Sequence, residues 1–271
     1  MINVAVSGAA GRMGRRIIAL SHEHPKLKVV AALDAPKNPS VGKDAGDIAG
    51  IGHIGVKVTD DYKAAIALCD VVIDFSSPEA TIRNVGEAVN KGKAMIIGTT
   101  GLSDQQKIIV SEAASSTPCM LAPNMSLGVN LLFNLVERVA SSLGDNYDVE
   151  IIESHHNQKK DAPSGTAAKL AEIVAGSLKR DLDEVGIYGR YGMVGARNPK
   201  EIGIMSVRAG DIVGEHTVMF CTNGERIELT HKAHSRDAFA KGAVQAAVWI
   251  MNEPAGRLYD MRDVLGLKET A

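Results

Sequence analysis

The sequence has few aromatic residues, few cysteines and almost no excess of charge of either sign. Aromatic residues make up 4 %, and 30 Lys+Arg oppose 32 Asp+Glu in 271 residues. This balance argues against a dedicated nucleic-acid-binding protein, which normally carries a strong basic excess. Three scattered cysteines, Cys69, Cys119 and Cys221, have no metal-type spacing and form no plausible disulfide framework. Each cysteine lies within or beside apolar sequence, so we expect buried thiols. Because no apolar signal segment opens the chain, we expect a cytoplasmic protein.

One long stretch lacks charge altogether. No charged residue occurs between Glu112 and Glu137, a gap of 24 positions that is long enough to span a bilayer. The gap contains two prolines and three asparagines, which a lipid-facing helix tolerates poorly. We therefore expect a strand, a loop and a buried helix here, and no membrane span.

The first half of the chain alternates β-branched runs with helical patterns. Predicted strands cover residues 2–7, 28–34, 71–75 and 94–99. Predicted helices cover residues 12–22, 78–91 and 103–115, and residues 35–55 are expected to form a long loop with little structure of its own. This alternation is typical of βαβ units in a parallel sheet, so we predict an α/β domain over residues 1–127.

The second half has a different pattern. Predicted helices cover residues 129–143 and 166–178, and predicted strands cover residues 148–153, 202–208, 215–221 and 226–231. Turn signals, Gly210-Asp211 and Asn223-Gly224, separate the last strands. We predict a smaller α+β domain with a mostly antiparallel sheet over residues 128–235. A long apolar helix at 238–251 is expected to return to the first domain as part of a C-terminal segment, residues 236–271.

A glycine loop links the first strand to the first helix. It reads Gly8-Ala9-Ala10-Gly11-Arg12-Met13-Gly14. Glycines permit a tight turn there, and the N–H groups of a helix N-terminus attract a pyrophosphate. Asp34, at the end of the second strand, can accept hydrogen bonds from an adenosine ribose. We interpret this as a Rossmann-type dinucleotide site. A purely structural turn is the alternative, and Arg12 is either a phosphate ligand or a solvated side chain.

The cofactor and its nicotinamide side are less closely defined. A carboxylate at Asp34 repels a 2′-phosphate, whereas Lys37 lies close enough to compensate in part, so we predict that NADH serves at least as well as NADPH. Two uncharged segments, Gly98-Thr99-Thr100-Gly101 and Ala122-Pro123-Asn124-Met125, follow predicted strands. They suit a nicotinamide ring, and ordinary strand-to-helix turns are the alternative.

The segment from Glu153 to Ala167 concentrates polar side chains of several kinds. His155 and His156 can transfer protons near neutral pH, and Lys159 can hold an anion or donate a proton. Ser164-Gly165-Thr166 opens a helix whose N–H groups can bind a carboxylate. The segment therefore predicts a site for a small anionic substrate with a proton donor beside it.

Structural explanations exist for each part of this segment. The histidine pair can be structural or can bind a metal, but no matching Cys, Asp or Glu spacing supports a metal, and we predict none. Ser164 can be only a helix cap, worth about 1 kcal/mol.

These motifs together resemble one family. The glycine loop, Gly98-Thr99-Thr100, the His155-His156-x-x-Lys159 cluster and Asp161-Ala162-Pro163-Ser164-Gly165-Thr166 are similar to those of 4-hydroxy-tetrahydrodipicolinate reductase (dihydrodipicolinate reductase), as is the run Val207-Arg208-Ala209-Gly210-Asp211-Ile212-Val213-Gly214-Glu215-His216. The resemblance covers essentially the whole chain. It implies NAD(P)H-dependent reduction in the diaminopimelate route to lysine, and a homotetramer built by pairing the sheets of a substrate-binding second domain.

The resemblance also implies roles for individual residues. His155 is the expected proton donor and acceptor, and Lys159 a second proton donor. The expected ligands of a cyclic dicarboxylate substrate are His156, Gly165 and Thr166. The expected dinucleotide ligands are Gly8, Ala9, Ala10, Gly11, Arg12, Met13 and Asp34, with Gly98, Thr99, Thr100, Ala122, Pro123, Asn124 and Met125 around the nicotinamide. Gln158 and Ala35 replace basic residues of some members, which weakens the local positive charge and support for NADPH respectively.

Two other functions fit parts of the pattern. A related aspartate-type dehydrogenase shares the glycine loop but is expected to lack the full histidine–lysine and Ser-Gly-Thr arrangement. A nucleotide-sensing protein without catalysis needs no proton donors.

Overall fold

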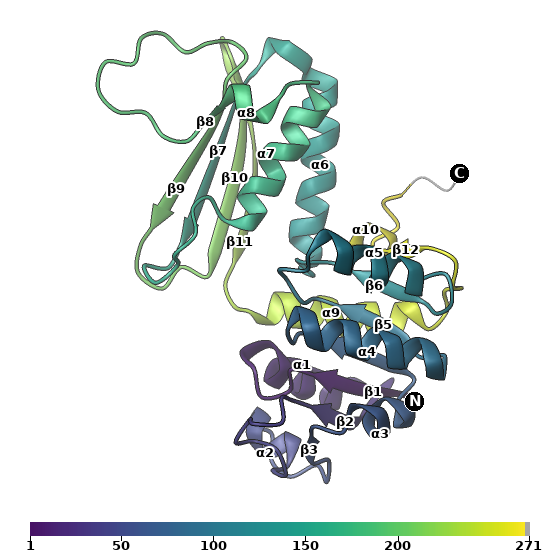
Figure 1. Ribbon diagram of the computed structural model, residues 1–271. Helices are drawn as coiled ribbons and strands as arrows, with labels where there is room; N and C mark the ends of the chain where they lie inside the picture. Colours follow the sequence, from purple (N-terminus) through teal and green to yellow (C-terminus); the bar gives the residue numbers. More distant parts are fainter. Residues whose placement is uncertain (269–271) are drawn as a thin grey trace. The chain divides into compact units, whose positions relative to one another are not determined.

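The computed structural model describes residues 1–268, which form two compact units. The first unit comprises residues 1–127 together with the chain from Asp237 onward, and the second is Gly128–Arg236. Each unit has its own sheet and its own helices (Figure 1). The C-terminal helix that the sequence pattern predicts belongs to the first unit.

The first unit is built on a seven-stranded sheet with the order β12-β6-β5-β4-β1-β2-β3, and every pairing is parallel. Its strands are β1 (Ile2–Ser7), β2 (Leu27–Leu33), β3 (Val58–Thr59), β4 (Val71–Asp74), β5 (Ala94–Ile97), β6 (Cys119–Leu121) and β12 (Leu258–Tyr259). Its helices are α1 (Arg12–Glu23), α2 (Ala45–Ala49), α3 (Tyr62–Leu68), α4 (Pro78–Lys91), α5 (Asp104–Ala113), α9 (Asp237–Ile250) and α10 (Met261–Val264).

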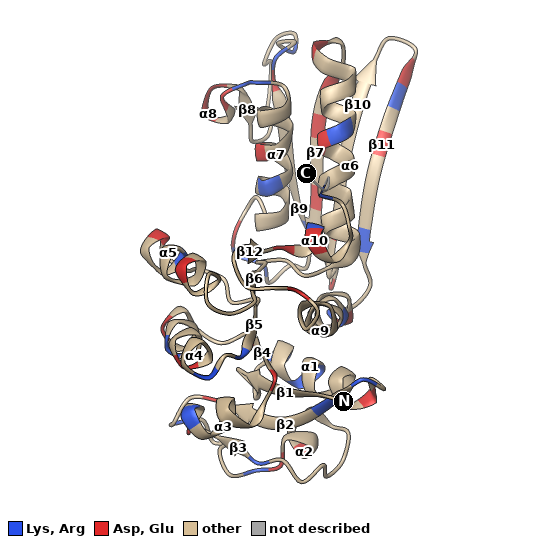
Figure 2. Cartoon of the chain, turned by 90° about the vertical axis from the view of Figure 1, so that its right-hand side faces the viewer, with Lys and Arg blue, Asp and Glu red and all other residues tan. Residues whose placement is uncertain are grey.

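Both faces of this sheet are covered, because its strands are apolar on both sides, as parallel strands usually are. Alternate residues of β1 separate the two cores: Val4 and Val6 pack with α1 and α9, and Ala5 packs with α3, α4 and α5. Figure 2 shows these two helical layers on opposite sides of the sheet. A two-pronged ion pair from Arg16 to Asp237, at 2.7 and 2.8 Å, joins α1 to the start of α9.

The second unit is a five-stranded sheet with helices on one face (Figure 1). Its strands are β7 (Asp148–His155), β8 (Gly186–Ile187), β9 (Ile202–Arg208), β10 (Gly214–Thr222) and β11 (Glu225–Ala233), in the order β11-β10-β7-β9-β8. Its helices are α6 (Leu127–Leu143), the 3-10 turn Gly144–Asn146, α7 (Gly165–Ser177) and α8 (Leu182–Val185). Residues of α6 and α7 pack on Ile151, Val218 and Phe220.

The predicted fold class is confirmed, but the second sheet is mixed rather than mostly antiparallel. β10 pairs antiparallel with β7 and β11, whereas β9 pairs parallel with β7 and β8. The crossover through α7 returns the chain to the same end of the sheet, which makes β9 parallel to β7. The tight turn at Asn223-Gly224, where Gly224 has a φ of +94°, makes β11 antiparallel to β10.

The segment 35–55, predicted as a loop, contains α2. Asp44 caps this helix by accepting N–H bonds from Gly46 and Asp47, and Gly50 ends it in the left-handed region. Five residues are too few for a helical period to be visible in the sequence. The same reason applies to β3, β8 and β12, which have two residues each. The charge-free stretch forms β6, a loop and the start of α6, and in residues 1–268 no helix has the length and apolar character to cross a bilayer.

Candidate active site

The glycine loop brings the end of β1 close to two other backbone segments. Gly8 has a φ of +77°, and a Cβ placed on it would lie 2.3 Å from the carbonyl oxygen of Phe75. A Cβ on Gly14 would lie 2.1 Å from the carbonyl oxygen of Gly8. The N-cap of α1 is Gly11, which has no side chain to cover the N–H groups of the first turn. These groups fit an anion such as a pyrophosphate.

Asp34 is held against this loop. Its Oδ2 accepts the N–H of Ala10 at 2.8 Å, and its Oδ1 accepts the N–H of Ala35 and the amide of Asn38, both at 2.8 Å. The N–H groups of Gly8 and Ala9 donate to Leu33, and that of Gly11 donates to Gly8. The amides of Gly8 to Gly11 are thus engaged within the protein, whereas those of Arg12, Met13 and Gly14 in the first turn of α1 have no acceptor in the helix and suit an anion.

The predicted nicotinamide-side turn is organised by a buried aspartate that the sequence analysis did not select. Asp74, at the end of β4, has no solvent exposure. Its Oδ1 lies 3.2 Å from the Thr99 hydroxyl and accepts hydrogen bonds from Ser76, and its Oδ2 accepts the Asn84 amide at 2.9 Å. Burial raises the pKa of Asp74, against the effect of these hydrogen bonds. In the sequence, Asp74 could have been selected as a single acidic residue inside an otherwise apolar strand.

The remaining predicted cofactor residues lie at the same edge of the sheet. A Cβ on Gly98 would lie 2.2 Å from the ring of Phe75, so any larger residue there requires this ring to move, and Thr100, two positions further on, is exposed. Ala122 to Met125 follow β6: Ala122 and Met125 are buried, Pro123 is exposed, and Asn124 accepts the N–H of Ser126. Because all strands are parallel, these turns gather at the carboxyl edge with Gly8 and Asp34, where ligands bind in such sheets.

In the second unit, His155 is paired with a buried carboxylate. Nδ1 of His155 lies 2.6 Å from Oε2 of Glu153, whose side chain has no solvent exposure. The guanidinium of Arg208 donates to both oxygens of Glu153 at 2.9 and 2.8 Å. Burial alone would raise the pKa of Glu153, but hydrogen bonds from Arg208 and His155 outweigh it and lower the pKa to about 2. Glu153 is therefore an anion at neutral pH.

His155 is partly buried, with a side chain 12 % exposed. Burial lowers the pKa of His155, and the Glu153 carboxylate opposes that shift. The ring of His216 meets it edge-on, with centroids 5.2 Å apart. Burial, followed by the neighbouring His155, lowers the pKa of His216 to about 4, so His216 is neutral at physiological pH. Its Nε2 lies 2.9 Å from the Ser164 hydroxyl.

The start of α7 lies on the same cluster. The Ser164 hydroxyl accepts the N–H of Ala167 at 3.2 Å and caps the helix, and the Ser164 N–H donates to Glu153 at 3.1 Å. The first turn consists of Gly165, Thr166 and Ala167, all uncharged, which suits an anionic ligand. The structure thus joins His155 to the predicted Ser-Gly-Thr helix start through Glu153.

Lys159 and His156 lie in the turn between β7 and α7. Lys159 donates to Asp161 at 2.8 Å with a side chain 19 % exposed, and its N–H donates to the carbonyl of His156 at 3.1 Å. No local pattern in the sequence points to a role for Glu153, Arg208 or His216. Arg208 and His216 are 55 and 63 positions from Glu153 in the chain, and only the pairing of β7 with β9 and β10 brings them together.

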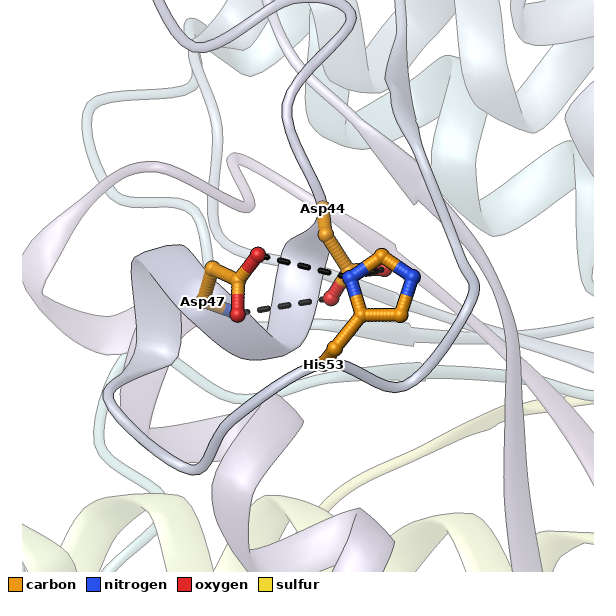
Figure 3. A group of neighbouring side chains, drawn as sticks. All are labelled: Asp44, Asp47 and His53. Carbon is orange, nitrogen blue, oxygen red and sulfur yellow. Dashed lines mark hydrogen bonds and ion pairs between the residues drawn. The ribbon is translucent and has the colours of Figure 1, made fainter.

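Among residues 1–268, one group of side chains has metal-ligand atoms within reach of one another: Asp44, Asp47 and His53 (Figure 3). Nδ1 of His53 lies 3.5 Å from Asp44 and 3.4 Å from Asp47. Oδ1 of Asp44 accepts the N–H groups of Gly46, Asp47 and Ile54. We assign this group to the folding of the loop around α2, because His53 and Asp47 are largely exposed and Asp44 is engaged by the backbone.

Fold and side chains together define a nicotinamide-dependent oxidoreductase, with a Rossmann-type unit and a separate unit that contains a histidine–carboxylate pair and an uncharged helix start. Residues 2–125 match the family "Dihydrodipicolinate reductase, N-terminus", and residues 128–265 match "Dihydrodipicolinate reductase, C-terminus". The chain belongs to the dihydrodipicolinate reductase family. The predicted family and the predicted enzyme class are therefore confirmed.

Similar proteins align with this chain along nearly its whole length. The 4-hydroxy-tetrahydrodipicolinate reductase of Hahella chejuensis is 53 % identical over 99 % of this chain and 100 % of its own, and that of Syntrophotalea carbinolica is 52 % identical with the same coverage. A solved dipicolinate-bound dihydrodipicolinate reductase from a Paenisporosarcina species is 25 % identical, with a TM-score of 0.75 over 97 % of this chain and 98 % of that one. An amine dehydrogenase from Mycobacterium smegmatis, 13 % identical with a TM-score of 0.58, shares the fold alone over 94 % of each chain.

Proposed function

We propose that the protein reduces 4-hydroxy-tetrahydrodipicolinate to tetrahydrodipicolinate with NADH or NADPH, in the diaminopimelate route to lysine. The observation that supports this most directly is the pairing of His155 with the buried Glu153 beside the uncharged helix start at Gly165. It supplies a proton-transfer group and an anion site in one cluster. Full-length relatives that are reductases of this name support the same substrate.

The dinucleotide is assigned to the first unit. The first-turn amides of Arg12 and Met13 would bind the pyrophosphate, and Asp34 would bind the adenosine ribose. Thr99, held by Asp74, would lie on the nicotinamide side with Gly98, Thr100 and residues 122–125. When bound, the reduced nicotinamide supplies the hydride, and the protein contributes orientation, charge and the proton.

The proton is assigned to His155. Because Nδ1 faces Glu153, Nε2 is the ring nitrogen left for the substrate. Loss of the 4-hydroxyl as water leaves a conjugated, unsaturated cyclic imine dicarboxylate. Hydride addition to one of its carbons gives an enamine-like carbanion, and His155 protonates the neighbouring carbon. Lys159 stabilises the developing negative charge or donates a proton itself.

The two carboxylates of the substrate need positive potential. The start of α7, with Gly165 and Thr166, would bind one carboxylate, and His156 and Lys159 supply further donors. The Paenisporosarcina relative was solved with dipicolinate, a cyclic dicarboxylate, which supports this substrate class.

Asp34 also bears on the choice of cofactor. A carboxylate fixed by Ala10, Ala35 and Asn38 can accept from ribose hydroxyls and repels a 2′-phosphate. We therefore propose that NADH serves at least as well as NADPH.

A homotetramer and a cytoplasmic location complete the proposal. Within residues 128–236, helices cover only one face of the sheet, and the segment between β8 and β9 exposes large apolar side chains. These are Tyr188, Tyr191, Met193 and Val194. Several exposed apolar side chains in one short segment favour self-association. All three cysteines are unpaired thiols, as in a reducing compartment.

The decisive experiment is cofactor oxidation followed by absorbance, with freshly generated substrate and with NADH and NADPH in parallel. Turnover with this substrate is expected with both cofactors. Turnover only with oxaloacetate and ammonia would identify an aspartate-type dehydrogenase instead. Dinucleotide binding without oxidation of either cofactor would identify a sensor, and either result would overturn the proposal.

A further inference from the structure

One carboxylate connects three separate elements of the second unit. Glu153 lies on β7. Its two oxygens accept hydrogen bonds from Nδ1 of His155 on the same strand, from both terminal nitrogens of Arg208 on β9, and from the N–H of Ser164 at the start of α7. Ser206, across the β7–β9 pairing, adds a hydrogen bond. A buried anion that satisfies this many donors is fixed in position.

The contact with Glu153 also determines which nitrogen of His155 is available. An anionic carboxylate only accepts, so Nδ1 must carry a proton at 2.6 Å from Oε2. The proton that His155 transfers is then the one on Nε2. A Cβ on Gly214, at the start of β10, would lie 3.0 Å from this Nε2, so glycine there keeps the approach to Nε2 open.

The surrounding groups leave Glu153 as the anion in contact with the ring. His216 and His231 lie in the strands beside it, at positions paired in register, and both are held toward the neutral form because burial lowers their pKa. Arg208 and Lys159 are cations that disfavour a charged His155, and Asp161 is an exposed carboxylate bound to Lys159. Loss of the Glu153 charge would leave His155 among cations and neutral rings.

We propose that Glu153 is the positioning residue of the reductase reaction: it fixes His155 with Nε2 toward the substrate, favours its proton-loaded form, and ties it to the carboxylate-binding start of α7. This inference rests on the proposed function, since it assigns a partner to the proposed proton donor. Glu153 itself has no solvent exposure and acts through the groups that bind it: His155, Arg208, Ser164 and Ser206.

The test compares Glu153→Gln with Glu150→Gln. Both residues lie on β7, and Glu150 binds Arg190 and Arg197 at the other end of the strand, so it is a matched control for the loss of a paired carboxylate. In Glu153→Gln the charge is lost at nearly constant shape. We expect the pH above which activity falls to move down by about one unit or more, because an opposite charge in contact shifts a pKa by about 1–3 units.

The kinetic constants separate positioning from binding. In Glu153→Gln we expect kcat to fall by about 10- to 100-fold, as for a misaligned proton donor, while the KM for the cofactor stays unchanged. Glu150→Gln should keep both the pH profile and kcat. An unaltered pH profile in Glu153→Gln, or the same shift in Glu150→Gln, would overturn the inference.

A second readout needs no turnover. Diethyl pyrocarbonate reacts with a histidine only when its imidazole is neutral, so the pH dependence of modification at His155, read by peptide mass spectrometry, reports the protonation of this ring. The midpoint should be lower in Glu153→Gln than in the wild type, and an unchanged midpoint contradicts the inference. This result is independent of the proposed function, whose own failure would appear as absent turnover in the wild type.

If Glu153→Gln does not fold, as shown by loss of its circular dichroism and of NADH binding, Glu153→Asp decides. It keeps the charge and shortens the reach by one methylene. A lower kcat of Glu153→Asp with an unchanged pH profile supports the positioning role, and an unchanged kcat overturns it.

Discussion

Oδ2 of Asp34 accepts a 2.8 Å hydrogen bond from the backbone N–H of Ala10. The carboxylate proposed to select the cofactor is thus attached to the loop proposed to bind its pyrophosphate. Asn38 holds the other oxygen at 2.8 Å. A change at residue 34 therefore acts on the loop as well as on the ribose, and a test must separate the two effects.

We predict that Asp34→Ala lowers kcat/KM for NADH by about tenfold or more, since a hydrogen bond to a charged group contributes about 1.5–3 kcal/mol. The kcat/KM for NADPH should fall less, because the repulsion between the Asp34 carboxylate and the 2′-phosphate disappears. Initial rates with both cofactors measure this. Asn38→Ala is the control, since it removes one contact of Asp34 but keeps the carboxylate. Equal losses with both cofactors would show that Asp34 acts only through the loop.

For the proton-transfer groups, we predict that His155→Gln and Lys159→Ala each lower kcat by about 10²–10⁴-fold, the usual effect of removing a positioned proton donor. Lys160→Ala is the matched control, because Lys160 is an exposed neighbouring cation. Steady-state rates at saturating cofactor measure the effect. Near-normal turnover in either variant would refute the role assigned to that residue.

At both candidate sites, local spacing in the sequence was enough to predict which of the selected residues lie together. The glycine loop, Asp34 and the turn at Gly98 are each adjacent to a strand end, and in a parallel sheet all such ends share one edge. Local spacing was therefore enough to predict that they gather. The same applies to His155 and the start of α7, which one short turn connects.

The partners of these residues could not be predicted in this way. Glu153 meets Arg208 and His216 only through the register of β7 with β9 and β10, and the parallel pairing of β9 was itself not foreseen. Asp74 lies within the predicted strand 71–75, and its contacts with Thr99 and Asn84 depend on how β4, β5 and α4 pack. Side-chain networks follow from tertiary packing, which periodicity does not specify.

Gly98 provides a test of close packing in the first unit. A Cβ there would lie 2.2 Å from the ring of Phe75, so we predict that Gly98→Ala destabilises the protein by about 1–3 kcal/mol and weakens NADH binding. Gly86→Ala is the control: Gly86 lies inside α4 with nothing within 4 Å of its added Cβ, and the change should stabilise by up to about 1 kcal/mol. Thermal unfolding of both variants measures the effects. Equal melting temperatures would contradict the predicted contact.

The exposed apolar segment between β8 and β9 provides a test of assembly. Tyr191 and Met193 are fully exposed, with fractions of 99 % and 104 %. We predict that replacing both with Asp lowers the mass measured by light scattering from that of a tetramer, because charge opposes burial of this segment. The control is Ile108→Asp, an exposed apolar residue of α5 in the first unit. A tetramer that persists in the double variant would place the interface elsewhere.

Glu153 links stability to pH in a predictable direction. Its pKa is lowered to about 2 in the folded protein from an ordinary 4.5, because hydrogen bonds from Arg208 and His155 outweigh the cost of burial. A depressed carboxyl pKa contributes stability that is present above pH 4.5 and is lost as the pH falls toward 2, here about 3 kcal/mol in all. About 2 kcal/mol of this should disappear between pH 6 and pH 3. Because Glu153→Gln lacks the titrating group, the difference in unfolding free energy between wild type and variant should shrink by that amount from pH 6 to pH 3. Urea unfolding at fixed protein concentration measures this difference. A difference that stays constant from pH 6 to pH 3 would show that Glu153 is not held as an anion by these contacts.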